Sequence, residues 1–112
     1  MVSQFDKIRA KKFLSLFAID VAKIADSFED ATVLKKDIDQ SVTVLEQKLE
    51  TEINRSNRAK ESYFESAFYT PALDECSVFV SKYYNAKSAN EAQSVFFDAL
   101  ISIEYYNEQI KI

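Results

Sequence analysis

The stretch Leu34-Lys-Lys-Asp-Ile38-Asp-Gln-Ser-Val42-Thr-Val-Leu45-Glu-Gln-Lys-Leu49-Glu-Thr-Glu-Ile53 decides the fold. Six apolar residues recur in it at spacings of 4, 4, 3, 4 and 4: Leu34, Ile38, Val42, Leu45, Leu49 and Ile53. This spacing places all six side chains on one face of an α-helix, and the residues between them are mostly polar. The stretch therefore predicts an amphipathic helix with coiled-coil character.

The helical phase continues beyond this stretch, through Ser56, Lys60, Tyr63 and Ala67. Two interpretations fit: one helix over residues 31–69, which would be ~58 Å long at 1.5 Å per residue, or a break near Asn54–Asn57. Helical patterns beyond 25 residues are uncommon in small domains, which favours the break. The unbroken phase favours one helix. We expect one long second helix, which follows a capping signal at residues 27–30 and is ended by Thr70-Pro71.

The rest of the chain also has helical spacing, and we expect further helices over residues 4–26, 70–84 and 89–109. Thr70 and Pro71 suit the N-cap and first position of one helix, and Ser88-Ala-Asn-Glu91 is a capping box for the last. The chain has no Gly and one Pro, which disfavours β-hairpins. The predicted fold is all-α: one domain over residues 1–112, an antiparallel helical bundle of four helices, or five if the second breaks.

The first helix is apolar on two sides. One stripe consists of Phe13, Phe17, Val21 and Ile24, and an adjacent stripe of Phe5, Ile8, Leu16 and Ile19. We therefore expect this helix to be central in the bundle. The predicted core of 70–84 is Leu73, Cys76, Val80 and Tyr84, with Phe79 and Tyr83 beside it. The predicted core of 89–109 and the residue after it is Ala92, Val95, Phe96, Ala99, Leu100, Ile103, Tyr106 and Ile110.

The composition excludes most kinds of active site that a sequence can reveal. The 112 residues include no Gly, no His and no Trp, and a single Cys. Phosphate-binding loops need Gly, zinc sites need several Cys or His, and Ser-His-Asp triads need His. We therefore expect a protein that is not an enzyme and that uses no metal and no cofactor.

Three features bear on where the protein works. Lys11-Lys12 before the apolar residues 13–19 resembles the start of a signal peptide, but Asp20 and Lys23 interrupt the run, so we expect a core helix there. No stretch approaches the ~20 apolar residues that span a bilayer. Cys76 is the only Cys, and we expect it to be a buried thiol in a reducing cytoplasm.

Charge is distributed unevenly along the chain. Residues 1–60 contain 11 basic and 10 acidic side chains, whereas residues 61–112 contain 3 basic and 8 acidic ones. The second part also holds 11 of the 15 aromatic residues. An acidic surface with exposed Tyr suits a basic protein partner and would repel the phosphates of nucleic acid. A solvated acidic face over an aromatic core would give the same composition.

The last helix contains the main candidate site. Phe97, Ile101 and Tyr105 follow one another at i, i+4 and i+8 on the side opposite the predicted core, and Asp98, Glu104 and Glu108 flank them. An apolar stripe with an acidic rim is typical of a protein interface. Burial of this helix on two sides, by the first and second helices, would explain the same stripe.

Three further residues join the predicted interface: Asp74, Glu75 and Tyr83. Adjacent residues on a helix point 100° apart, so the two members of an aromatic pair rarely share one buried position. We therefore expect Tyr83 and Tyr105 to be at least partly exposed. A wide aromatic core with its hydroxyl groups at the edge is the alternative.

These observations favour a non-enzymatic inhibitor, an immunity or antitoxin-type protein that neutralises a basic toxin such as a nuclease. The composition is similar to that of bacteriocin immunity proteins, among which acidic helical bundles with Tyr pairs occur. No aligned motif accompanies this similarity. The alternative is a helical adapter, a secretion chaperone or a homo-oligomeric scaffold, including a homodimer, that uses the apolar stripe of residues 34–53 as a seam.

Overall fold

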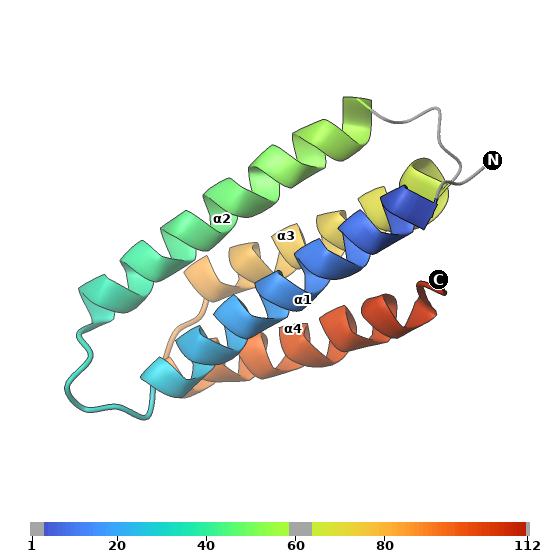
Figure 1. Cartoon of the computed structure of the whole chain (residues 1–112). Helices are drawn as coiled ribbons and strands as arrows, with labels where there is room; N and C mark the ends of the chain where they lie inside the picture. Colours follow the sequence, from blue (N-terminus) through green and yellow to red (C-terminus); the bar gives the residue numbers. More distant parts are fainter. Residues whose placement is uncertain (1–3, 59–63, 112) are drawn as a thin grey trace.

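The computed structural model describes residues 4–58 and 64–111 of the chain. It contains four α-helices, α1 (Gln4–Ser27), α2 (Lys35–Arg58), α3 (Thr70–Tyr84) and α4 (Ala89–Gln109), and a π-helical segment, η1 (Glu65–Tyr69), directly before α3. No strand occurs in the described part of the chain. Contacts join α1 to α4, α4 to α3, α3 to α2 and α2 to α1. Figure 1 shows the four helices side by side with neighbours antiparallel, so the all-α bundle of four is confirmed.

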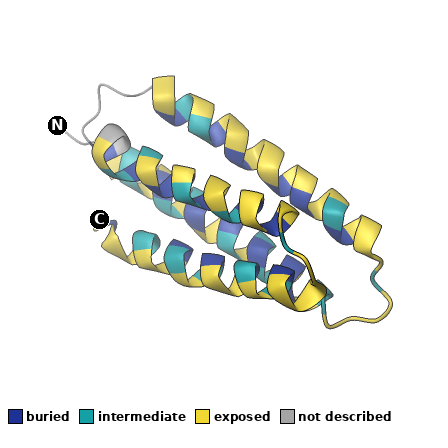
Figure 2. Ribbon diagram, turned by 180° about the vertical axis from the view of Figure 1, so that it is seen from behind, coloured by how far each residue is buried: buried dark blue, intermediate teal, exposed yellow. Residues whose placement is uncertain are grey.

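The core is built from one face of each helix (Figure 2). In α2 the predicted stripe is buried through Ile38, Val42, Leu45 and Leu49, and Ile53 packs at its edge. Leu34, the first predicted member, precedes the helix and is 54% exposed. In α4 the buried residues are Ala92, Phe96, Ala99 and Ile103, and Val95, Leu100 and Tyr106 pack against the core from its edges. The stripe that could have formed a coiled-coil seam with another chain therefore fills the core of its own bundle.

The second helix differs from the prediction at both ends. It begins at Lys35, because residues 28–34 form turns in which the Asp30 carboxylate accepts hydrogen bonds from the backbone N–H and the hydroxyl of Thr32. It ends at Arg58, slightly beyond the predicted break. The hydroxyl oxygens of Ser56 and Thr70 lie 2.7 Å apart, so the chain reverses direction between α2 and α3, and one helix through residue 69 is wrong. Residues 59–63 lie outside the described part.

As predicted, α3 begins at Thr70-Pro71, but Thr70 is its first helical residue and not its N-cap. Tyr69 has helical dihedral angles (φ −73°, ψ −47°), and η1 continues into α3 without a side-chain cap. In a regular α-helix the Pro71 ring would collide with the carbonyl of residue 67. The wider turn of a π-helix relieves this collision, since its hydrogen bonds span five residues. It also places Phe64 and Tyr69 on the same face, where their rings stack at 6.0 Å.

The outer face of α1 is a third departure from the sequence-based expectation. Its inner face is buried as predicted through Phe17, Val21 and Ile24, whereas the adjacent stripe of Phe5, Ile8, Leu16 and Ile19 is 50–70% exposed. The helix is therefore not central. It packs against α4 and α2 with one face and leaves an apolar stripe at the surface.

Candidate protein-binding surface

The outer face of α4 carries the predicted interface residues. Phe97, Ile101 and Tyr105 are 45%, 69% and 59% exposed, on the side opposite the buried Phe96 and Ile103. The helix contacts α1 and α3 with its other sides. Burial of this stripe by neighbouring helices, the alternative explanation, is therefore excluded within the chain. We refer to Phe97, Ile101 and Tyr105 as the α4 stripe.

The rim of the α4 stripe is acidic. Asp98, Glu104 and Glu108 are all exposed. The sequence of α4 contains no Lys or Arg, so no basic residue of the helix itself neutralises these carboxylates. The N-terminus of the helix is fixed by Ser88, whose hydroxyl accepts a hydrogen bond from the backbone N–H of Glu91 at 3.1 Å, as the capping box predicts. Six of the nine predicted site residues thus lie on one rigid helical face.

Tyr83 is not part of this surface, which corrects the prediction. Its side chain is 7% exposed, and Tyr84 is exposed instead. Burial, followed by its hydrogen bond to the Asp39 carboxylate, raises the pKa of Tyr83 well above its usual value. The same bond, with a smaller contribution from Lys35, lowers the pKa of Asp39. The core face of α3 consists of Leu73, Cys76, Val80 and Tyr83. Its last spacing is therefore three residues, from Val80 to Tyr83, and not the four that the prediction of Tyr84 assumed.

Asp74 and Glu75 behave differently from each other. Asp74 is exposed on α3, whereas Glu75 is half-buried and accepts a hydrogen bond from the hydroxyl of Tyr106 on α4. That bond, together with burial, raises the pKa of Tyr106 to about 12. Glu75 therefore joins α3 to α4, and of these two carboxylates only Asp74 is free to extend the acidic surface.

The sequence did not reveal a row of polar contacts between α2 and α3. The hydroxyl of Tyr69, which is fully buried, donates to Glu52 at 2.7 Å, and Arg55 donates to the other oxygen of Glu52 at 2.6 Å. Tyr83 and Asp39 form a second such bond nearer the other end of α2. The signal was a carboxylate on an otherwise apolar face, since Glu52 falls between Leu49 and Ile53. A buried carboxylate needs hydrogen-bond donors, and a Tyr hydroxyl is one.

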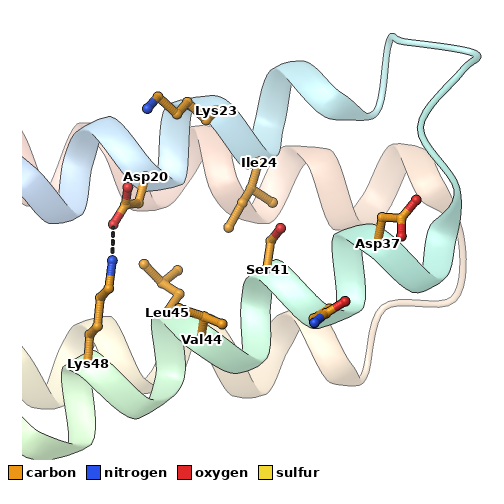
Figure 3. Close-up of a pocket in the computed structure, with 9 residues that line it drawn as sticks. Asp20, Lys23, Ile24, Asp37, Ser41, Val44, Leu45 and Lys48 are labelled. Atoms are coloured by element: carbon orange, nitrogen blue, oxygen red, sulfur yellow. Dashed lines mark hydrogen bonds and ion pairs between the residues drawn. The ribbon is translucent and has the colours of Figure 1, made fainter.

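The boundary between α1 and α2 is an open groove (Figure 3). Two adjoining hollows of about 460 and 550 Å³ share Asp20, Val44 and Lys48 in their linings. Figure 3 shows Ile24 and Leu45 directed into the groove and Lys48 reaching Asp20, at 3.3 Å, while Lys23 points away from α2. A further hollow of about 660 Å³ lies where the 28–34 and 85–88 loops meet, with Phe28, Tyr83 and Tyr84 in its wall.

The described part of the chain brings together no group of three or more Cys, Asp or Glu that could hold a metal ion. Cys76 is buried as predicted, and burial, with the Glu75 charge, raises its pKa to about 12. At neutral pH it is a protonated thiol and a poor nucleophile. None of the helices in residues 4–58 and 64–111 has the length and apolar content needed to cross a membrane.

Comparison with known proteins found no matching family model, no matching curated protein and no matching solved structure. The function is therefore inferred from the surface chemistry of the chain alone.

Proposed function

We propose that the chain is a non-enzymatic binding protein that inhibits a basic protein, in the manner of an immunity or antitoxin-type protein. One observation carries the proposal: the α4 stripe is exposed within a rim of three exposed carboxylates, on a helix without a basic residue. Large side chains that become desolvated supply binding energy, and surrounding charges direct the encounter and select the partner.

A nuclease-like toxin is the partner that this chemistry fits best. Enzymes that cleave nucleic acid need a cationic cleft to hold phosphates. A helix that presents Asp98, Glu104 and Glu108 beside Ile101 and Tyr105 can occupy such a cleft and exclude the substrate. The same carboxylates oppose nucleic acid as the direct ligand of this protein.

The proposal assigns no catalytic residue, no cofactor and no metal to the chain, and places its action in the cytoplasm. Two tyrosines with strongly raised pKa values have structural hydrogen-bond partners: Tyr83 bonds Asp39, and Tyr106 bonds Glu75. Perturbed pKa values also arise in structural networks, so these shifts do not indicate an active site by themselves.

An adapter, secretion chaperone or oligomeric scaffold is the second candidate. As inferred from the sequence, such a protein would use the apolar face of α2 as the contact between chains. That face is occupied, because Ile38, Val42, Leu45 and Leu49 are buried in the core. A scaffold would therefore have to use another surface, and the inhibitor is the proposal that we favour.

The test is affinity capture from lysate of the source cell with tagged protein at low and at high salt. The double variant Tyr105→Ala/Glu108→Lys removes one aromatic anchor and reverses one rim charge. Glu50→Lys, on the exposed outer side of α2, is the matched control for the charge change. We expect wild type and the control to capture one basic protein at low salt and the double variant to lose it.

The second part of the test is whether the chain inhibits the captured protein. We expect purified wild-type chain, added in equal amounts, to abolish its enzymatic activity, and the double variant to leave that activity intact while keeping its helical circular dichroism. Equal capture by wild type and double variant would remove the α4 stripe as the interface.

A further inference from the structure

The exposed apolar stripe on α1 is flanked by basic residues, the opposite of the α4 stripe. Arg9, Lys12 and Lys23 are exposed near Ile8, Leu16 and Ile19. Lys23 lines the edge of the α1–α2 groove, and its amino group points away from α2 (Figure 3). One molecule thus presents two apolar stripes, one with basic and one with acidic neighbours, on helices that contact each other.

Hydrogen bonds fix the register of these two helices. The side chain of Gln93 donates to the carbonyl of Ala25 at 3.1 Å, and that of Asn107 donates to the Ser15 hydroxyl at 3.0 Å. Lys11 donates to the carbonyl of Asn107 at 2.7 Å. Because α1 and α4 are antiparallel, residues whose numbers sum to about 120 lie at the same height along the bundle. Ile19 is therefore level with Ile101, and Lys12 with Glu108.

We propose that a second copy of this chain covers the α4 stripe, with α1 of each copy lying on α4 of the other. A two-fold axis parallel to the helices, between the two copies, produces this arrangement. Corresponding residues of the two copies then lie at the same position along the bundle axis. Ile19 of one copy then meets Ile101 of the other, and Leu16 meets Tyr105. Lys12 opposes Glu108, and Lys23 opposes Asp98, so apolar groups and opposite charges coincide at four successive levels.

The area of this face matches a weak dimer. It is two helices wide, ~20 Å, and as long as α4, ~30 Å, which gives ~600 Å² per copy and ~1,200 Å² in all. That is the lower limit for specific protein–protein interfaces. Association should therefore be reversible in the micromolar range and, because charges contribute, weaker at high salt.

This dimer would regulate the surface on which the proposed function rests. The α4 stripe is covered in the dimer and free in the monomer, so self-association and capture of a basic partner compete. The dimer itself requires no partner, and its test uses the purified full chain alone. A failure of the dimer is therefore distinguishable from a failure of the proposed inhibitor role.

Sedimentation velocity over a range of micromolar concentrations at low salt is the experiment. For wild type we expect the mean mass to rise from 12.9 kDa toward twice that value. Lys12→Glu should weaken association about tenfold, since symmetry places the new repulsion at two sites in the interface. Adding Glu108→Lys to this variant restores opposite charges and should restore the dimer. Lys36→Glu, the same change at an exposed position on α2, should have no effect.

A second exchange, Lys23→Glu with Asp98→Lys, tests another level of the same interface. Circular dichroism of each variant establishes that the helices persist. A wild-type mass of 12.9 kDa throughout the concentration range would overturn the proposal. So would a dimer that Lys12→Glu leaves unchanged, or a charge exchange that fails to restore association in both folded double variants.

Discussion

The two sides of α2 hold it in the bundle by different means. On the α3 side, buried or half-buried hydrogen bonds join Tyr69 to Glu52 and Tyr83 to Asp39. On the α1 side lies an open groove crossed by one ion pair, Lys48–Asp20, whose side chains are 57% and 34% exposed. Each side uses a carboxylate, but Glu52 and its Tyr69 donor are buried, whereas the Lys48–Asp20 pair is open to water.

From this difference we infer that burial, more than the chemical nature of a contact, decides how much the contact contributes to stability. Water competes poorly for a carboxylate such as Glu52, so loss of its donors leaves a charge with little solvation. Water replaces the partner of an exposed ion pair almost without loss. The register of α2 is thus set mainly against α3, and α1 follows the shape of the apolar core.

The largest effect is expected from Glu52→Ala. The substitution removes the acceptor for the Tyr69 hydroxyl at 2.7 Å and for Arg55 at 2.6 Å. We expect the free energy of unfolding to fall by about 3 kcal/mol. Urea unfolding followed by circular dichroism measures it. Glu50→Ala, two residues away and exposed, is the control and should change stability by less than about 0.5 kcal/mol. Equal losses in the two variants would contradict the importance of this contact.

Tyr83→Phe removes the second hydrogen bond on the α3 side without changing the ring. The Asp39 side chain is 40% exposed, so water replaces part of the lost contact, and we expect a decrease of about 1 kcal/mol in the free energy of unfolding. The same urea experiment measures it. Tyr84→Phe, on the exposed neighbour, is the matched control. A loss as small as in the control would mean that this hydrogen bond contributes no more to the free energy of unfolding than an exposed contact does.

The pH dependence of stability tests the same Tyr83–Asp39 hydrogen bond. Its pKa is lowered from the usual 3.8, first by the Tyr83 hydroxyl and then by Lys35. A carboxyl whose folded pKa is depressed stabilises the protein above its unfolded pKa, and this stabilisation is lost as pH falls through the folded pKa. We expect Tyr83→Phe to lose less stability than wild type between pH 5 and pH values below 3.8. Parallel curves for the two proteins would show that the hydroxyl does not set this pKa.

The smallest effect is expected on the α1 side. Lys48→Ala removes the ion pair with Asp20, and the free energy of unfolding should change by less than about 0.5 kcal/mol. Moderate salt should reduce even this difference, since exposed charges are screened. A loss of the size expected for Tyr83→Phe would mean that this ion pair holds α1 to α2 and would remove the contrast between the two sides.

The sequence was most informative where the contacts of a residue are local. The start of α4 follows from its capping box, and the exposure of Ile101 follows from its position opposite the core face. Helical periodicity did not reveal where the chain turns back, because the phase of a pattern is the same in one helix and in two. With no Gly or Pro near residue 58, only the polar residues Asn54–Asn57 indicated a turn at the end of α2.

The remaining differences arise from contacts that are distant in sequence or geometry that is not α-helical. Which of Tyr83 and Tyr84 is buried depends on Asp39, which lies 44 positions earlier. A residue before Pro disfavours the helical region because the Pro ring crowds its backbone N–H and Cβ. Thr70 is nevertheless helical, directly after the π-helical segment at Glu65–Tyr69, which periodicity did not reveal.

The position of Cys76 allows local unfolding of this bundle to be followed by the reactivity of its thiol. The thiol lies on the buried face of α3, the helix that contacts both α2 and α4, and it is the single Cys of the chain. With its pKa raised to about 12, it offers almost no thiolate to a reagent while the bundle is closed. The rate at which such a reagent modifies the thiol therefore reports how often α3 opens. Cys76 is thus an intrinsic probe of local unfolding.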